Sequence, residues 1–441
     1  MKEKRRLSVE YSNRATDAYD RRDYKEACRL SLKALRQDPE NYVALISLGN
    51  LAFLNKKYKT ALKFYHRADN VFPGYVVVQI NLANSFYELK NYIAADRYAL
   101  AALELDSSYV PALVLLGQIR LEQEDFAAAV SYFRQAERQD TSDPWLYNSL
   151  SQACWKNGET AAALEAGFRA VEISAGGRDH QLNLGYLFYE ASLEKKAENY
   201  DSLLERWQRR YGADPYVRQF VDSLCHNSEV SKINPQFVAG IFDVFAPDFE
   251  EVLTSLDYQA PARIADVLSE LFSKEKQARL QILDLGCGTG FLGKVLKKYA
   301  ASKGLEGVDL SAGMLAVAAE KNIYDTLTQG DIVDVLPQRK NRFDLIAAAD
   351  VFTYFGALDS LFNLCFSALK NQGHLVFTAS ENSCSDRKWF LHAAGRFQHN
   401  KKYIVSTLEK CGFQMEKILP CKLRNEGDLE VRGWVFSAQK T

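Results

Sequence analysis

Three glycines alternate with other residues in the run Asp284-Leu285-Gly286-Cys287-Gly288-Thr289-Gly290, which follows the apolar pair Ile282-Leu283. The apolar residues predict a buried parallel strand, and the residues from Phe291 to Tyr299 predict a helix directly after the turn. Because glycine has no side chain, such a turn lets a ligand approach the backbone closely. The spacing is not the G-x-G-x-x-G of dinucleotide-binding turns. By itself it leaves open a site for another nucleoside cofactor or a purely structural turn.

Acidic residues stand at the ends of the next predicted strands. Asp309 ends a segment at 304–310, and folds of this kind use an acid there to bind ribose hydroxyls. Asp331 follows a third predicted strand, and Asp350 ends an almost uninterrupted apolar run at 343–351, which predicts a fourth buried strand. Further strands are predicted at 374–378, 413–420 and 431–438.

This order of glycines and acids resembles class I S-adenosylmethionine-dependent methyltransferases, whose first motif is D/E-x-G-x-G-x-G. The resemblance implies a Rossmann-like α/β domain with a mostly parallel seven-stranded sheet, in which the last strand runs antiparallel. It also implies that Asp309 binds the ribose of S-adenosyl-L-methionine, that Asp331 binds the adenine amino group, and that Ile332 packs on the adenine. Met314 is expected near the adenine or in the ordinary core, and Ser311 is expected to cap its helix. The cofactor-binding residues predicted in this way are Asp284, Gly286, Cys287, Gly288, Gly290, Asp309, Leu310, Met314, Asp331, Ile332 and Asp350.

Methyl transfer from a sulfonium is an in-line displacement, so its main requirement is alignment of nucleophile, methyl group and sulfur in a dry site. A base helps where the acceptor is a hydroxyl or an amine that must lose a proton. The predicted base is His399, because its ordinary pKa lies near neutrality, and Tyr354 is a weaker candidate. Arg396 is predicted to hold an anionic acceptor through a bidentate contact. A lone histidine can equally have a structural role, and that alternative stays open.

Three features bear on the class of acceptor. The segment Asp350-Val351-Phe352-Thr353 lacks the prolines of the N/D-P-P-Y/F motif of enzymes that methylate nucleic-acid amino groups. The segment 242–250 resembles a lead sequence of small-molecule methyltransferases, where it covers the cofactor pocket. The formal net charge of −1 gives no basic signature of nucleic-acid binding. A small-molecule or protein acceptor is therefore predicted, and no nucleic acid.

The N-terminal half repeats at intervals of 34 residues, counted between Ala27, Ala61, Ala95, Ala129 and Ala163. A second alanine follows seven residues after each of these, at a position where small side chains let helices touch. The pairs Leu48-Gly49, Leu116-Gly117 and Leu184-Gly185 fall in the same register. This pattern resembles the tetratricopeptide repeat, a helix-turn-helix unit of that period. Five units and a degenerate sixth capping unit predict an α-solenoid over residues 8–211.

The first helices of such repeats line a concave groove. One groove-facing position is occupied by Asn50, Asn84, Gln118 and Gln152. Because an amide side chain donates and accepts at once, four of them suit the backbone of an extended peptide. This resembles the asparagine ladder of protein O-glycosyltransferase repeat domains and predicts a protein or extended peptide as partner. The alternative, that the amides bond neighbouring helices, stays open.

The whole chain resembles a group of bacterial methyltransferases that carry N-terminal tetratricopeptide repeats. The predicted organisation is a repeat domain at 8–211, a connector at 212–235 and a methyltransferase domain at 236–441. The predicted function is S-adenosylmethionine-dependent methyl transfer, with the repeats recruiting a protein partner or substrate. The alternative is a non-catalytic assembly scaffold whose second domain binds S-adenosylmethionine as a structural or sensing ligand.

Composition adds several exclusions. The 441 residues are 47% hydrophobic and 25% charged, and no apolar run is long enough to span a bilayer, so no membrane partner is predicted. The eight cysteines are scattered without metal-ligand spacing, which indicates free thiols and no metal site. The first residues lack the apolar stretch of a signal peptide, and a cytoplasmic location is predicted.

Overall fold

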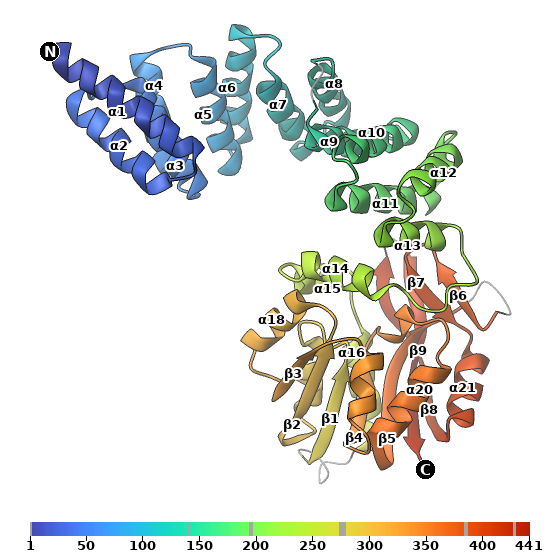
Figure 1. The fold of residues 1–441 in the computed structure, drawn as a ribbon. Helices are drawn as coiled ribbons and strands as arrows, with labels where there is room; N and C mark the ends of the chain where they lie inside the picture. The colour runs from blue at the N-terminus through green and yellow to red at the C-terminus, as the bar shows by residue number, and fades with distance from the viewer. Residues whose placement is uncertain (1, 140–141, 194–196, 273–278, 383–386, 427–428) are drawn as a thin grey trace. The chain divides into compact units, whose positions relative to one another are not determined.

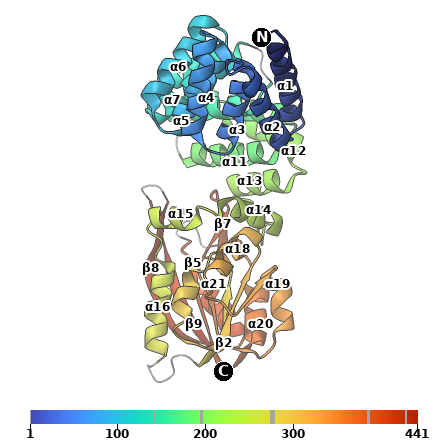
Figure 2. The same cartoon turned by 90° about the vertical axis from the view of Figure 1, so that its left-hand side faces the viewer.

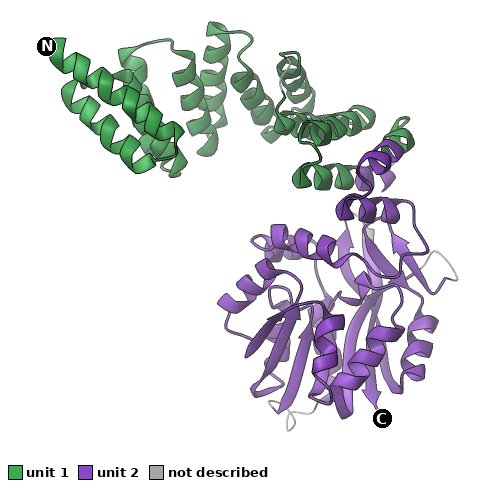
Figure 3. Ribbon diagram, in the orientation of Figure 1, with its two compact units in different colours: residues 1–187, 195–203 green, residues 188–194, 204–441 purple. Residues whose placement is uncertain are grey.

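The computed structural model describes residues 2–139, 142–193, 197–272, 279–382, 387–426 and 429–441. The chain divides into two compact units, residues 1–187 with 195–203 and residues 188–194 with 204–441 (Figure 3). None of the described helices combines the length and the apolar character needed to cross a membrane.

The first unit consists of consecutive helix pairs (Figure 1). The bounds are α1 Lys2–Asp20, α2 Tyr24–Gln37, α3 Tyr42–Leu54, α4 Tyr58–Val71, α5 Val76–Glu88, α6 Tyr92–Leu105, α7 Val110–Glu122, α8 Phe126–Glu137, α9 Pro144–Lys156, α10 Thr160–Ile173, α11 Arg178–Leu193 and α12 Tyr200–Tyr211. The first helices of successive pairs, from α1 to α9, also pack against one another, so they share one side of the stack. The predicted helical repeats are confirmed, although α1 begins ahead of the predicted start at residue 8.

Small residues allow the paired helices to approach closely. The ten alanines at the two repeating positions have no exposed surface. Gly49 of α3 lies against the ring of Tyr65, and Gly117 of α7 lies against the ring of Phe133. A Cβ atom would stand 2.3 Å from the first ring and 2.6 Å from the second, far inside the ordinary contact range of 3.4–4 Å. Packing therefore requires the repeated small residues.

The second unit contains a seven-stranded sheet with the order β3-β2-β1-β4-β5-β9-β8 (Figures 1 and 2). The strands β1 to β5 are parallel, whereas β9 runs antiparallel to both β5 and β8. The bounds are β1 Leu280–Leu285, β2 Ala300–Asp309, β3 Thr326–Gln329, β4 Phe343–Ala348, β5 Leu369–Ser380, β8 Phe413–Glu426 and β9 Leu429–Lys440. The predicted mostly parallel sheet is confirmed, with its antiparallel strand last in the chain.

Helices cover both faces of this sheet, because the strands present apolar side chains to both. Ile282 of β1 packs with α16 and α17 on one face, whereas its neighbour Leu283 packs with α19, α20 and α21 on the other. The bounds are α13 Pro215–Leu224, α14 Pro235–Phe245, α15 Phe249–Ser255, α16 Ala260–Leu271, α17 Phe291–Leu296, α18 Ala312–Glu320, α19 Ile332–Val335, α20 Asp359–Ala368 and α21 Lys401–Lys410.

Two elements are shorter than predicted. The helix α17 ends at Leu296 instead of Tyr299, because the chain must turn there to enter β2 at Ala300. The strand β4 ends at Ala348, because Asp350 has a φ of 56°, in the left-handed region that ends a strand.

A hairpin of β6 (Trp389–His392) and β7 (Arg396–His399) occupies a segment for which no strand is predicted. Its turn contains Gly395, whose φ of 73° suits glycine. The predicted connector at 212–235 contains α13, and the division between the compact units passes through α11 and α12. The domain boundaries after residues 211 and 235 therefore stay a prediction.

Candidate cofactor and acceptor site

A cavity lies at the carboxyl ends of the parallel strands in the second unit. Its volume is about 180 Å³. Most of the predicted site residues line it, namely Gly286, Cys287, Gly288, Asp309, Leu310, Met314, Asp331, Ile332, Asp350, Tyr354 and Arg396. Segments that are far apart in the chain thus meet at one edge of the sheet, as expected for ligand sites in open α/β folds.

The glycine turn after β1 needs glycine at each of its three positions. The backbone φ angles of Gly286, Gly288 and Gly290 are 62°, 52° and 93°. Residues that carry a side chain rarely adopt such positive φ angles. A Cβ atom on Gly286 would lie 2.4 Å from Cγ2 of Val351, whereas one on Gly288 would meet nothing closer than the Phe249 ring at 3.8 Å. Gly288 therefore presents bare backbone to the cavity, as the close approach of a cofactor requires.

Asp284 and Gly290 do not line the cavity, and their contact with a cofactor stays a prediction. Asp284 is buried behind the turn, where its Oδ2 accepts a hydrogen bond of 2.6 Å from the Tyr324 hydroxyl. Burial raises the pKa of Asp284 to about 7, against the opposing effect of that hydrogen bond. A Cβ atom on Gly290, which begins α17, would lie 3.1 Å from the Tyr324 ring. Both residues support the turn from behind.

Asp309 ends β2 with its carboxylate at the cavity. Its Oδ2 accepts the N–H of Gly288 at 2.8 Å, and its Oδ1 accepts the N–H of Ser311 at 2.9 Å. Burial raises the pKa of Asp309, whereas these N–H groups lower it. Each oxygen keeps a second lone pair that a ligand hydroxyl can use. Ser311 caps α18 by accepting the N–H of Met314, as predicted, and the Met314 side chain is buried at the cavity wall.

Asp331 already has protein partners at both oxygens. Its Oδ1 caps α19 by accepting the N–H of Val333 at 3.1 Å, and its Oδ2 pairs with Nζ of Lys232 at 2.6 Å. Lys232 comes from the predicted connector, where the N–H of Ile233 donates to the Tyr354 carbonyl at 2.9 Å. The predicted adenine-binding acid is therefore held by a lysine that no sequence motif identified.

The helices α14 and α15 cover this cavity, and their side chains in its lining are Pro235, Val238, Phe242, Phe249 and Leu253. Asp243 of α14 accepts a hydrogen bond of 2.6 Å from the Ser311 hydroxyl. Glu250 of α15 pairs with Lys321, which also donates to the Thr289 carbonyl at 2.5 Å. These contacts hold the segment 242–250 over the cavity, where the resemblance places it.

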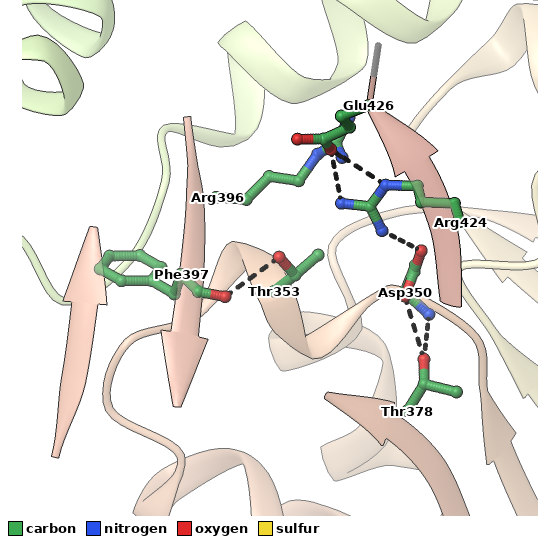
Figure 4. A network of polar contacts seen from close by, with 7 residues as sticks. All are labelled: Asp350, Thr353, Thr378, Arg396, Phe397, Arg424 and Glu426. Carbon is green, nitrogen blue, oxygen red and sulfur yellow. Dashed lines mark hydrogen bonds and ion pairs between the residues drawn. The ribbon is translucent and has the colours of Figure 1, made fainter. Parts of the chain in front are cut away.

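Two arginines and two carboxylates form a network at the cavity wall (Figure 4). Arg424 of β8 donates from Nη1 to Asp350 at 2.6 Å, and from Nε and Nη2 to Oε1 of Glu426 at 3.0 and 2.8 Å. Arg396 of β7 donates from Nη1 to the same Glu426 oxygen at 2.5 Å. The backbone N–H of Asp350 donates to the Thr378 hydroxyl at 2.8 Å, and Asp350 has the left-handed backbone often found at functional sites. Protein partners therefore hold Asp350, and its contact with a cofactor stays a prediction.

Tyrosines stand beside this network. Tyr354 belongs to the short helix η3 (Phe352–Tyr354), and Tyr258 precedes α16. Burial raises the pKa of both hydroxyls, so both remain protonated near neutral pH. A protonated phenol donates a hydrogen bond but does not remove a proton, which conflicts with the predicted role of Tyr354 as a base.

His399 does not line the cavity, and the prediction that it acts as the base is corrected. Its ring has no exposed surface, and Nε2 donates to the Phe355 carbonyl at 2.8 Å. Burial lowers the pKa of His399 to about 4, so the ring is neutral near pH 7. The physical reason is strand geometry. Side chains alternate along β7, so Arg396 at the cavity and His399 point to opposite faces of the hairpin.

Among the cavity residues with titratable side chains, three carry no prediction from the sequence, namely Lys232, Tyr258 and Arg424. Lys232 lies in the predicted connector, Tyr258 follows the lead segment 242–250, and Arg424 lies between the last two predicted strands. Charged side chains are common in such places because they usually face water. The sequence therefore contains no signal that separates these residues from exposed ones.

Comparison with known families agrees with both units. Residues 256–416 match the family model described as a methyltransferase domain, and residues 12–72 and 80–144 match the model of the tetratricopeptide repeat. This chain joins tetratricopeptide repeats to a methyltransferase domain. Most of the cavity lining falls within residues 256–416, and the helices α1 to α8 fall largely within the matched repeats.

Curated relatives match only part of this chain. A malonyl-(acyl-carrier protein) O-methyltransferase of Priestia megaterium is 30% identical over 152 residues, which are 34% of this chain and 53% of the relative. One of Legionella pneumophila is 28% identical over 182 residues, which are 40% of this chain and 59% of the relative. The chain thus spans about half the length of these curated relatives. The crystal structure of an S-adenosylmethionine-dependent methyltransferase from Mesorhizobium loti is 21% identical, with a TM-score of 0.32, and covers 40% of this chain and 96% of its own.

Proposed function

We propose that this chain transfers the methyl group of S-adenosyl-L-methionine to a small-molecule or protein acceptor. The observation that carries the proposal is the meeting of bare backbone at Gly288 with the carboxylates of Asp309 and Asp331 in one cavity. When bound there, the sulfonium cofactor supplies an electrophilic methyl group. Asp309 would bind the ribose hydroxyls, and the buried side chains of Met314 and Ile332 would contact the adenine.

The covering helices support the same function. Methyl transfer from a sulfonium requires alignment in a site from which water is excluded. Phe242 of α14 and Phe249 of α15 close the cavity with aromatic rings, which meet edge to face at a centroid distance of 5.7 Å. The ion pair between Glu250 and Lys321 and the hydrogen bond between Asp243 and Ser311 hold this cover in place.

Calorimetric titration with S-adenosylmethionine and S-adenosylhomocysteine tests the proposal. Asp309→Ala should weaken binding of both ligands at least about tenfold, because hydrogen bonds to a charged group contribute about 1.5–3 kcal/mol. Asp334→Ala is the matched control, since Asp334 is an exposed acid of α19 outside the cavity lining. Absence of binding by the wild-type chain would overturn the proposal. Binding without turnover would instead favour the scaffold alternative.

We also propose that the repeats recruit an extended peptide of a partner or substrate. Asn84, Gln118 and Gln152 lie on the first helices α5, α7 and α9, and their side chains make no hydrogen bond within the described residues. Asn50 differs, because its Oδ1 accepts from the Tyr65 hydroxyl at 2.7 Å and from Asn81 at 3.2 Å. Asn50 therefore follows the alternative in which an amide bonds neighbouring helices, and the proposed ladder consists of the other three amides.

Removal of the ladder tests this second proposal. The triple variant Asn84→Ala, Gln118→Ala and Gln152→Ala should retain the helical circular dichroism of the wild type and lose partner capture from cell extract. Asn50→Ala is the contrasting variant, since it should lower stability through the lost hydrogen bonds while retaining capture. Unchanged capture by a folded triple variant would exclude a peptide-binding role for the three amides.

A further inference from the structure

The guanidinium of Arg396 has N–H donors at the cavity that its bond to Glu426 does not use. Its Nη1 donates to Glu426, and the side chain lines the cavity beside the Tyr354 hydroxyl. Arg424 is different, because its Nε, Nη1 and Nη2 all donate to Asp350 or Glu426. Arg424 thus fixes the two carboxylates, and Arg396 presents its remaining donors to whatever enters.

The charges of this network allow an anion to bind beside it. Asp350 and Glu426 are both bonded to arginine, so neither carboxylate stands unpaired against an incoming negative group. Arg424 has little exposed surface, and its ion pairs lie in a dry setting where charged hydrogen bonds are strong. The Arg396 side chain is 34% exposed, and its forked guanidinium suits a carboxylate better than a neutral hydroxyl or an amine.

The described cavity lining also lacks a group suited to removing a proton near pH 7. Burial raises the pKa of the Tyr258 and Tyr354 hydroxyls and of the Cys287 thiol, so all three hold their protons. The carboxylates of Asp331 and Asp350 are engaged by Lys232 and Arg424. Asp309 accepts the N–H groups of Gly288 and Ser311 and is the residue proposed to bind the cofactor ribose, so it is not available to an acceptor. A hydroxyl or amine acceptor needs a base, whereas a carboxylic acid is already ionised at neutral pH.

We propose that the acceptor is a carboxylate held by Arg396 and Tyr354, so that the product is a methyl ester; this inference rests on the proposed methyl-transfer function. A carboxylate oxygen forms the new bond to the methyl carbon while the carbon–sulfur bond breaks, and the electron pair of that bond goes to sulfur. The acceptor becomes a neutral ester, the sulfonium becomes a thioether, and no proton moves. Because the ester is uncharged, its contact with Arg396 weakens, which favours release.

The chemistry of the product provides a test that does not require the acceptor to be identified first. The full chain is incubated with bacterial cell extract and S-adenosylmethionine labelled in its methyl group. The products are then treated with mild alkali, which hydrolyses methyl esters to volatile methanol but leaves N-methyl groups and methyl ethers intact. The expected result is label that alkali releases as methanol, and at least tenfold less of it with Arg396→Met.

Companion variants separate binding of the acceptor from folding. Arg396→Met should bind S-adenosylmethionine like the wild type in calorimetry, and Arg396→Lys should restore part of the ester formation. Tyr354→Phe should retain the fold and lower ester formation severalfold. The control is Arg432→Gln, because Arg432 of β9 is an arginine with 73% side-chain exposure that pairs only with Glu430 within the described residues.

Two results would overturn the inference while leaving the proposed function intact. The first is transferred label that resists alkali, which would identify a different acceptor atom. The second is full ester formation by folded Arg396→Met. A wild-type chain that neither binds the methyl donor nor transfers label would instead overturn the proposed function itself.

Discussion

The repeats and the methyltransferase domain both depend on glycine, for different reasons. In the repeats, Gly49 and Gly117 lie within helices, and an aromatic ring fills the space that a side chain would need. In the turn after β1, the backbone itself has positive φ, and Gly288 faces open space. Glycine serves packing in the first region and backbone conformation with ligand access in the second.

This difference extends to the contacts of each region. The repeats are held by the same small-residue packing used many times between neighbouring helices. The site depends on single contacts between distant segments, such as the pair of Asp350 and Arg424, which lie 74 residues apart. One substitution should therefore act locally in the repeats, whereas in the domain it should alter both folding and binding.

The largest expected effect comes from Gly286→Ala in the turn. Strain at positive φ and overlap with Val351 should together lower the unfolding free energy by about 2–5 kcal/mol. Gly288→Ala lacks the overlap and should cost only about 1–2 kcal/mol, while it weakens cofactor binding. Urea denaturation and calorimetry compare the two. Equal losses of stability would contradict the distinction drawn between these glycines.

Asp284 provides a pH-dependent difference between the two regions, because no described carboxylate of the repeats has a pKa raised by burial. The pKa of Asp284 is about 7, above the ordinary 3.8, so the folded state binds this proton more tightly than the unfolded chain. The contribution of Asp284 to the unfolding free energy should therefore fall as the pH rises from about 4 to about 7, by up to about 4 kcal/mol. The lowered pKa of His399 acts in the opposite direction over this range, so the comparison is between wild type and variant. Asp284→Asn should flatten this dependence in denaturation experiments, and an unchanged slope would show that Asp284 is not its source.

Gly117→Ala tests the packing role in the repeats. Overlap with the buried ring of Phe133 should lower the unfolding free energy by about 1–3 kcal/mol, without any backbone strain. The same substitution in a Phe133→Leu background should cost less, because the smaller side chain leaves room. Denaturation of the single and double variants measures this coupling. Additive costs would mean that the ring is not the cause.

Helix caps, whose loss typically costs about 0.5–2 kcal/mol, occur in both regions. Ser311 is buried, caps α18 and bonds Asp243, so Ser311→Ala should cost about 2 kcal/mol. Asn91 caps α6 of the repeats at an exposed position, and Asn91→Ala should cost about 1 kcal/mol or less. Thermal unfolding of the two variants gives the order. A larger loss at Asn91 would contradict the view that the domain depends more on single contacts.

Much of the fold could be predicted because its signals are local and repeated. Alanines recur every 34 residues, so each helix pair presents the same small side chains to its neighbours. The repeat period therefore predicts that the helix pairs stack on one another. The parallel strands are continuous apolar runs, and the acids at their ends are brought to one edge by the topology alone. This is why Gly288, Asp309 and Asp331 meet in one cavity as predicted.

The sequence by itself thus determined the order of elements, the repeat period, the glycine turn and the strand-end acids, because these depend on neighbouring residues and on general rules of chain topology. The tertiary structure alone decided which side chains face the cavity from the hairpin, the connector and the last strands. Strand alternation turned His399 away and left Arg396 inside, and antiparallel pairing of β8 with β9 brought Arg424 to Asp350. Those outcomes depend on register and on contacts between distant segments, which no local pattern encodes.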